Sequence, residues 1–182
     1  DPAMYSAGVE ALNVAETNPD VRSVILTGEG KHFCTGGNLN RILNNRAATP
    51  EEQAAGIEGL HSWIEAIRTF PKPVIAAVNG PALGGGNELV LACSYVIAAQ
   101  HAQFGQPEIN LNLLPGYGGT QRLVRKLYRR QGEAGMAEAV RLMVSGRNIS
   151  TPEALIQALN RVHKSQKTIE QLAKQIEMPV HA

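Results

Sequence analysis

Apolar residues recur with a helical period near the start of the chain and then form a continuous run. Tyr5, Val9 and Leu12 follow the i, i+4, i+7 spacing of one face of an α-helix. Residues 18–20, Asn-Pro-Asp, are typical of a turn, and residues 21–27 after them are rich in β-branched side chains. This pattern predicts a helix that leads into a buried strand.

The same order of helix and strand continues through the middle of the chain. Thr49, followed by a proline and two glutamates, has the pattern of a helix N-terminus, and apolar residues at helical spacing extend this helix to Ile67. Residues 74–78 form an unbroken apolar run of the kind found in strands buried on both faces, and residues 95–99 form a second short strand. Helices that alternate with buried strands predict an α/β fold with crossover connections.

Helical patterns dominate the last part of the chain. Residues 101–119 are dense in glycine, proline and asparagine, and a loop of this length is usually functional or disordered. Helices are expected at residues 120–128 and 136–145, and further helical patterns follow, the last of them near residues 169–176.

Composition narrows the class of protein. The chain has 182 residues, of which 43% are hydrophobic, so it is long enough to bury a core and is most simply one domain. Seventeen Lys and Arg residues against sixteen Asp and Glu leave a net charge of +1, which excludes the basic footprint of a nucleic-acid binder. No apolar stretch approaches the roughly 18 residues that span a bilayer. Cys34 and Cys93 lack the spacing of a zinc site or a disulfide scaffold, which favours a reducing compartment.

Several groups that look reactive have a simpler structural interpretation. The basic run at residues 122–130 contains Leu123 and Leu127 at helical spacing, which favours a solvated helix face over a phosphate-binding patch. Cys34 has no accompanying His and Asp arrangement, so a packed thiol is favoured over a nucleophile. The five histidines show no metal-ligand spacing, and we predict no metal.

Two glycine-rich loops follow predicted strands. The only triple glycine, residues 84–86, lies between the strand 74–78 and a helix that begins near Asn87, so its amides fall at a helix N-terminus and favour negative charge. A tight turn with no ligand is the alternative. The other loop presents Gly36 and Gly37. Two such loops can each offer one N–H to a single oxygen, as in an oxyanion hole. Neither has the pattern of a phosphate-binding loop, so the expected guest is an enolate-like oxygen.

Three long motifs carry a resemblance to a known family. KHFCTGGNL, PKPVIAAVNGPALGGGNEL and AQFGQPEINLNLLPGYGGTQRL resemble the enoyl-CoA hydratase/isomerase (crotonase) family, in the same order and over about residues 21–150. The resemblance implies the α/β crotonase (ClpP/crotonase-like) spiral of β-β-α units with C-terminal helices. It divides the chain into an acyl-CoA-binding core, residues 1–150, and a C-terminal helical segment, residues 151–182, which we expect to be incomplete.

The resemblance also assigns roles to residues. It implies that the amides of Gly37 and Gly85 form the oxyanion hole, that Glu88 activates water and that Glu108 protonates Cα. We expect the two carboxylates to face a shared pocket, close enough to hold one water, and their mutual repulsion to raise at least one pKa. The residues expected to bind the substrate are Gly37, Asn38, Leu39, Asn40 and Gly85.

The implied activity is syn addition of water across the 2,3 double bond of a 2-enoyl-CoA thioester. An isomerase or a thioester hydrolase of the same family, and a non-catalytic acyl-CoA-binding subunit, are the alternatives. Retention of both glutamates argues against the binding subunit, because binding needs only the amides. Coenzyme A is expected as part of the substrate, with no other cofactor and no metal.

The expected partners and location follow from the same resemblance and from composition. We expect a homotrimer or a dimer of trimers, no nucleic acid and no membrane partner. A cytoplasmic location is expected, and the mitochondrial matrix is not excluded. A strand that the family places after Leu155 is not recognisable, so we expect residues to be missing at the start of the chain and between Leu155 and Ser165.

Overall fold

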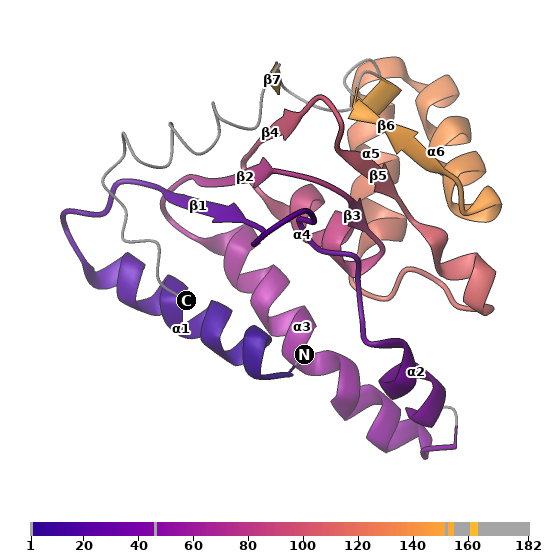
Figure 1. Cartoon of the computed structure of the whole chain (residues 1–182), viewed down its shortest axis with the longest axis horizontal. Coiled ribbons are helices and arrows are strands. Elements are labelled where there is room, and N and C mark those ends of the chain that lie inside the picture. Colours follow the sequence, from indigo (N-terminus) through magenta and orange to yellow (C-terminus); the bar gives the residue numbers. More distant parts are fainter. Residues whose placement is uncertain (1, 46, 152, 155–160, 164–182) are drawn as a thin grey trace.

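The computed structural model of the chain describes residues 2–45, 47–151, 153–154 and 161–163 (Figure 1). The helices are α1 (Pro2–Thr17), α2 (Leu39–Asn45), α3 (Pro50–Thr69), α4 (Gly85–Ala92), the short 3-10 helix η1 (Pro107–Leu111), α5 (Gly119–Gln131) and α6 (Glu133–Ser145). The strands are β1 (Val24–Thr27), β2 (Val74–Val78), β3 (Ala82–Leu83), β4 (Tyr95–Ala99), β5 (Gln103–Gly105), β6 (Asn148–Ser150) and β7 (Arg161–His163). Alternating helices and strands confirm the predicted α/β class.

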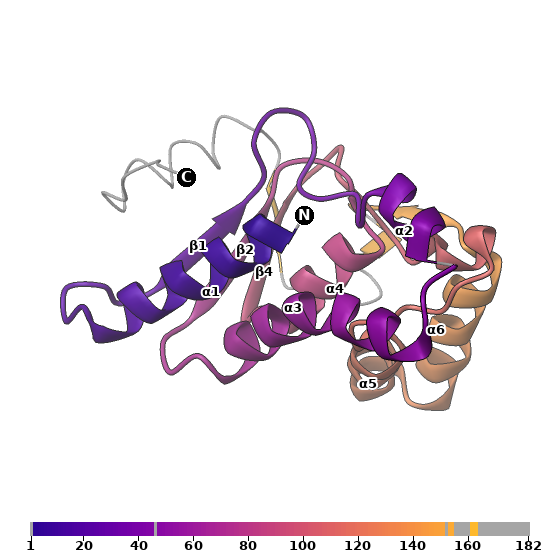
Figure 2. The same ribbon diagram turned by 90° about the horizontal axis from the view of Figure 1, so that it is seen from below.

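The main sheet has four parallel strands in the order β1-β2-β4-β7. Its register pairs Val24 of β1 with Val74 of β2, and Ile75 of β2 with Tyr95 of β4. Strand β2 is central and almost wholly buried, with Val78 fully inaccessible to solvent, as its unbroken apolar run predicts. Helices α1 and α3 lie side by side along one face of this sheet (Figures 1 and 2).

The contact between α1 and α3 is built around aromatic side chains. The rings of Tyr5 and Trp63 lie 6.3 Å apart between centroids, and both side chains are buried. The N-terminus of α3 is fixed by a capping box, in which Thr49 Oγ1 accepts the N–H of Glu52 and Glu52 Oε2 accepts the N–H of Thr49. The helix predicted from Thr49 is therefore confirmed, and it carries one wall of the cavity described below.

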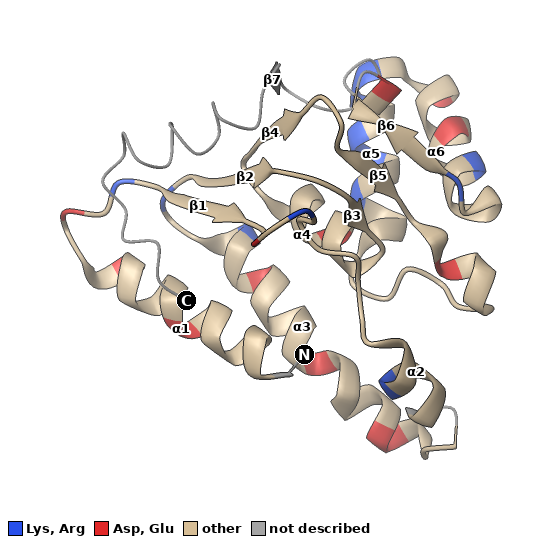
Figure 3. Cartoon of the chain, viewed as in Figure 1, with Lys and Arg blue, Asp and Glu red and all other residues tan. Residues whose placement is uncertain are grey.

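A smaller sheet of three strands, in the order β3-β5-β6, lies beside helices α4, α5 and α6 (Figure 1). Strands β3 and β5 are parallel, whereas β5 and β6 are antiparallel. Basic residues lie on α5 and acidic ones at the start of α3 (Figure 3). Leu123 and Leu127 of α5 are buried and Arg125 is exposed, which confirms an amphipathic helix, whereas Arg122 and Lys126 are only partly exposed. None of the described helices has the length and apolar character needed to cross a membrane.

The structure corrects the sequence interpretation where strands depend on distant partners. The first strand begins at Val24 rather than at residue 21, and residues 101–119 contain β5 and η1 rather than one long loop. Within residues 151–182, where helix was expected, β7 pairs with β4. These short strands exist because a neighbouring strand supplies hydrogen bonds, and local periodicity does not reveal that neighbour.

Two further expectations fall on the C-terminal part of the chain. The helical stripe near residues 169–176 lies outside the described residues, and so does most of the 155–165 segment where missing residues were expected.

Candidate active site

The two glycine-rich loops run side by side and are joined through a parallel bridge between Cys34 and Ala82. Leu83 N–H donates to the carbonyl of Cys34 at 2.9 Å, and Cys34 N–H donates to the carbonyl of Pro81 at 3.2 Å. A Cβ at Gly86 would lie 2.0 Å from the Cys34 oxygen, so this approach requires glycine. Gly84 has a φ of 54°, in the left-handed region that favours glycine. The contact between the loops therefore explains Gly86, and the backbone conformation explains Gly84.

The middle glycine of the triplet is under no such constraint. A Cβ at Gly85 would meet its nearest side chains at 3.4 Å or more, which is ordinary contact. Gly85 is the first residue of α4, and the N-cap Gly84 has no side chain to bond the first amides of the helix. Gly36 packs against the same point, since a Cβ there would lie 3.7 Å from the Gly85 nitrogen. The N-terminus of α4 therefore meets the loop that carries Gly37.

A cavity of about 540 Å³ opens beside this meeting point. Five of the residues predicted to form the site line it, and two others, Asn40 and Glu88, are not among its lining residues. The five are Gly37, Asn38, Leu39, Gly85 and Glu108. Apolar side chains form most of the remaining wall, including Ile42 and Ile57 from α2 and α3, and Leu111, Leu113 and Leu114. A cavity of this size and character suits a small-molecule ligand with a long apolar part.

Glu88 lies behind the cavity wall and is completely buried. Its Oε1 accepts the N–H of Tyr117 at 2.9 Å and the N–H of Gly119 at 2.6 Å, and its Oε2 has no partner among the described residues. Burial, with a smaller contribution from the charge of Glu108, raises the pKa of Glu88 to about 7 against the opposing effect of the two amides. The group is thus poised to exchange a proton near neutral pH.

Glu108 lies in η1 on the cavity wall, and burial raises its pKa above the usual glutamate value. Its Oε1 accepts a hydrogen bond from the buried Gln106, whose amide nitrogen donates to it at 3.1 Å and to the Gly84 carbonyl at 3.2 Å when the amide is oriented by its neighbours. For both glutamates the largest cause of the raised pKa is burial, and the repulsion that we expected contributes to the pKa of Glu88 as a smaller cause.

The loop segment of residues 116–119 connects Glu88 to the cavity. Its amides bind Glu88, and two side chains bind its carbonyls: His61 Nε2 lies 2.6 Å from the Gly116 oxygen, and Arg122 Nη1 donates to the Tyr117 oxygen at 2.6 Å. The ring of Tyr117 stands edge-on to His61, with centroids 5.5 Å apart, and lines the cavity. This segment therefore holds a buried carboxylate on one side and shapes the cavity on the other.

The sequence interpretation missed Gln106, Tyr117 and Arg122. Gln106 stands two residues before Glu108, and Tyr117 is the only aromatic residue among residues 116–119, so both had a positional signal. Arg122 belongs to the run interpreted as a solvated face, and nothing in its spacing separates it from the exposed arginines of the same helix. Its place in the site depends on a hydrogen bond to the backbone oxygen of Tyr117, five residues earlier.

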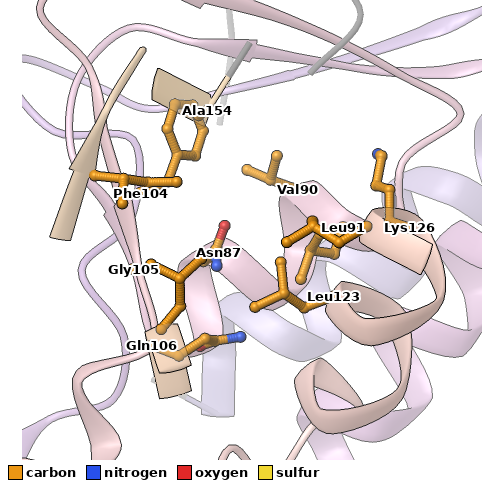
Figure 4. A pocket seen from close by; sticks show the side chains of 12 residues that line it. Asn87, Val90, Leu91, Phe104, Gly105, Gln106, Leu123, Lys126 and Ala154 are labelled. Atoms are coloured by element: carbon orange, nitrogen blue, oxygen red, sulfur yellow. The ribbon is translucent and has the colours of Figure 1, made fainter. Parts of the chain in front are cut away.

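A second cavity lies between α4, α5 and the small sheet (Figure 4). It has a volume of about 30 Å³, roughly the space one water occupies in the liquid, and its walls are mostly apolar. Lys126 borders it, and burial lowers the pKa of that amine. This cavity is too small to bind a thioester substrate. Across the part of the chain that the structure describes, no group of three or more His, Cys, Asp or Glu side chains is placed to hold a metal ion.

Known proteins resemble this chain in sequence and in overall structure. The family model described as enoyl-CoA hydratase/isomerase matches residues 2–177. A probable enoyl-CoA hydratase of Bacillus subtilis (strain 168) is 42% identical over 144 residues, which are 79% of this chain and 52% of that protein. A short-chain-enoyl-CoA hydratase of Clostridium acetobutylicum is 42% identical over 149 residues, 81% of this chain and 53% of that protein. The crystal structure of an enoyl-CoA hydratase from Polaromonas sp. JS666 has a TM-score of 0.83 and 45% identity, covering 94% of this chain and 66% of that one.

The chain spans about half the length of the curated relatives that it matches. The resemblance inferred from the three motifs is confirmed, and so is the crotonase fold.

Proposed function

The chain belongs to the enoyl-CoA hydratase/isomerase family, and on that premise we propose that it hydrates a 2-enoyl-CoA thioester to a 3-hydroxyacyl-CoA by syn addition of water. The observation that carries the proposal is the pair of acidic groups beside the α4 N-terminus: Glu88 lies in the first turn of α4, Glu108 lines the cavity together with Gly85, and burial raises the pKa of both. Two such carboxyl groups suit a reaction that takes one proton and gives another near neutral pH.

The amides of Gly37 and Gly85 polarise the substrate in this proposal. Both residues line the cavity, and Gly85 N–H is one of the unpaired amides at the start of α4. The thioester oxygen accepts both N–H groups, and the enolate that forms after attack is stabilised by about 3–4 kcal/mol for each donor. Because the donors are backbone groups in two loops that are hydrogen-bonded to each other, they need no rearrangement during the reaction.

The two glutamates divide the proton transfers. Glu88 takes a proton from water as the hydroxyl adds to Cβ, and Glu108 gives a proton to Cα. One water is consumed, and the total number of protons on the two carboxyl groups does not change. The contacts of Glu88 support this role, because two amides hold Oε1 while Oε2 has no partner among the described residues. Gln106 holds Glu108 Oε1 and so orients that carboxyl group towards the cavity.

One observation favours isomerisation as a second candidate. Only Glu108 lines the cavity, whereas Glu88 lies behind its wall. A single accessible carboxyl group that moves a proton between two carbons of the substrate is enough to shift a double bond, and the oxyanion hole serves both reactions.

The two functions are separated by the absorbance of the conjugated thioester. Hydration of crotonyl-CoA consumes this absorbance, whereas isomerisation of a 3-enoyl-CoA to the 2-enoyl isomer creates it. The proposal expects loss of the signal with crotonyl-CoA. A protein that only generates the signal from 3-enoyl-CoA is an isomerase, and a protein inactive on both that still binds CoA thioesters is a binding subunit.

Assembly and location complete the proposal. A homotrimer or dimer of trimers is expected from the family, and α6 presents Val140 and Val144 to solvent at 46% and 64% exposure, which an interface would cover. Light scattering at micromolar concentration tests this expectation, and a strictly monomeric species contradicts it. The two free cysteines fit a reducing compartment, so a cytoplasmic location remains the prediction, with the mitochondrial matrix as the alternative.

A further inference from the structure

Three of the polar side chains on the cavity wall that the mechanism leaves unused are two phenols and a guanidinium. Tyr5 of α1, Arg41 of α2 and Tyr117 all line the cavity that contains Gly85 and Glu108. The rest of this wall is largely apolar, and neither tyrosine hydroxyl has a hydrogen-bond partner among the described residues. Polar groups grouped inside an apolar cavity usually select a matching group on the ligand.

The position of Tyr117 places these groups near the acyl part of a substrate. Its backbone N–H binds Glu88, and its ring lies 3.6 Å from the point where a Cβ on Gly85 would stand. In the proposed reaction Glu88 activates the water that adds to Cβ, and the Gly85 amide binds the thioester oxygen. The ring of Tyr117 therefore borders the acyl chain rather than the far end of CoA.

Arg41 acts on the same region. Its positive charge lowers the pKa of the Tyr5 and Tyr117 hydroxyls, in opposition to the larger effect of burial. Tyr5 in turn raises the pKa of Tyr117. The Arg41 guanidinium donates to the carbonyl of Gly56 on α3, and the Tyr5 ring lies 3.4 Å from the point where a Cβ on Gly59 of the same helix would stand. Arg41 and Tyr5 therefore lie against neighbouring positions of α3, and both line the cavity together with Tyr117.

The guanidinium of Arg41 has N–H donors that make no hydrogen bond to the described residues. One of its nitrogens, Nη2, donates to the carbonyl of Gly56 at 2.9 Å, and in the described part of the chain no carboxylate lies within ion-pair distance of Arg41. A guanidinium carries five N–H donors in a planar fork that matches a carboxylate. A half-buried cation without a counter-ion is unfavourable, and an anionic ligand removes that cost.

Resting on the proposed hydration, we infer that the preferred substrate is a 2-enoyl-CoA whose acyl chain ends in a carboxylate, bound by the Arg41 guanidinium with the Tyr5 and Tyr117 hydroxyls. A phosphate of CoA has the same anionic chemistry and is the competing guest for Arg41. The place of Arg41 in the same cavity as Tyr117, whose ring lies beside Gly85, favours the acyl carboxylate, and the experiment below separates the two.

Binding of unreactive saturated thioesters tests the inference without turnover. Adipoyl-CoA and hexanoyl-CoA have six acyl carbons and the same CoA moiety, and differ in the terminal carboxylate. We expect the full chain to bind adipoyl-CoA at least tenfold more tightly in calorimetric titrations, as a charge-assisted bidentate contact warrants. Equal affinities overturn the inference.

Two variants and a control identify the residues. Arg41→Met should remove the preference for adipoyl-CoA and leave the affinity for hexanoyl-CoA within about twofold. If it weakens both thioesters equally, Arg41 binds a CoA phosphate and the inference is wrong. Arg68→Met removes an exposed arginine that pairs with Glu65 on α3, and should change neither affinity.

Tyr5→Phe keeps the ring against Trp63 and removes only the hydroxyl, so it provides a second test if Arg41→Met does not fold by circular dichroism. It should reduce the preference several-fold, and an unchanged preference overturns the inference. A hydration assay with crotonyl-CoA distinguishes this inference from the proposed function. If crotonyl-CoA is not hydrated but adipoyl-CoA still binds more tightly than hexanoyl-CoA, only the hydratase proposal fails. If crotonyl-CoA is hydrated but the two saturated thioesters bind equally, only the carboxylate inference fails.

Discussion

The backbone N–H of Tyr117 donates a hydrogen bond of 2.9 Å to Glu88 Oε1, while the ring of the same tyrosine lines the cavity. One residue thus contacts both the buried carboxyl group and the space where a substrate binds. A change in the position of Tyr117 moves the Glu88 carboxylate and the cavity wall together, so acyl-chain fit and proton transfer are mechanically linked in the proposed site.

Removal of either carboxyl group should slow hydration while binding is retained. Glu108→Gln and Glu88→Gln are each expected to lower kcat by about 10²–10⁴-fold, because each glutamine keeps the shape but transfers no proton. Steady-state kinetics with crotonyl-CoA provides the measurement, and the affinity for a saturated CoA thioester should change little.

Glu65→Gln is the matched control, since Glu65 is exposed on α3 and pairs only with Arg68 among the described residues. If Glu88→Gln retains full turnover while Glu108→Gln abolishes it, the two-glutamate mechanism is wrong and a one-base isomerase explains the site better.

The raised pKa of Glu88 predicts how the rate depends on pH. In the proposed mechanism Glu88 accepts a proton and must be ionised, so kcat should rise as the pH increases through about 7. A pH profile of kcat between pH 5 and 9 measures this midpoint, and an acidic limb with a midpoint near the ordinary glutamate value of 4.5 contradicts the assignment.

The same group should make the fold less stable as pH rises. The folded-state pKa of Glu88, about 7, lies above the ordinary value of 4.5, so the folded protein binds more protons than the unfolded chain between these pH values. The stabilisation is complete below pH 4.5 and is lost as pH rises through about 7, a difference of about 3 kcal/mol for this one group.

Thermal unfolding of the wild type and of Glu88→Gln at several pH values isolates this contribution. The difference in Tm between the two proteins should shift in favour of the variant as pH increases from 5 to 8, because glutamine does not ionise. If the difference in Tm between the two proteins does not change with pH, the pKa of Glu88 is not raised in the folded protein.

The triple glycine should respond unequally to alanine. Gly86→Ala forces a Cβ to within 2.0 Å of the Cys34 oxygen and should destabilise the fold by about 2 kcal/mol or more. Gly85→Ala makes only ordinary contacts, so its Tm should stay near the wild-type value. Equal losses of Tm in the two variants would show that the two loops do not meet at Gly86 and the Cys34 oxygen as described.

Arg122→Met tests the support behind Glu88. The variant loses the hydrogen bond to the Tyr117 oxygen and a positive charge that lowers the pKa of Glu88. We expect kcat to fall by about tenfold, as for the loss of one charged hydrogen bond, and the acidic midpoint of the pH profile to move upward. Arg125→Met, an exposed site on the same helix, is the control and should leave both unchanged.

The sequence predicts those parts of the molecule that are encoded locally. The helix cap at Thr49, the buried strand 74–78 and the strand 95–99 follow from local sequence patterns, and the three motifs identify the family. The roles of the two glutamates remain a prediction from that resemblance. Strand β3 has two residues and exists only because the backbones at Cys34 and Phe104 pair with it. A local sequence pattern does not predict such a strand.

The site shows the same division. The spacing of Gly84 and Gly86 indicates a special backbone but not its cause, because the Cys34 oxygen that excludes a side chain at Gly86 comes from 52 positions earlier in the chain. Burial of Glu88, which raises its pKa, is likewise a property of the assembled fold. Charge repulsion was the only cause that the sequence suggested.

The pairing of the two loops at Cys34 and Leu83 has an evolutionary consequence. Main-chain atoms make this junction, so the geometry of the amide donors is inherited independently of most side chains that surround them. A wall residue such as Arg41 is then free to diverge under selection for a new thioester, whereas a change that moves the backbone of Tyr117 also moves Glu88. A lineage built on this junction can therefore change its substrate range through side chains of the cavity wall that do not hold the glutamates.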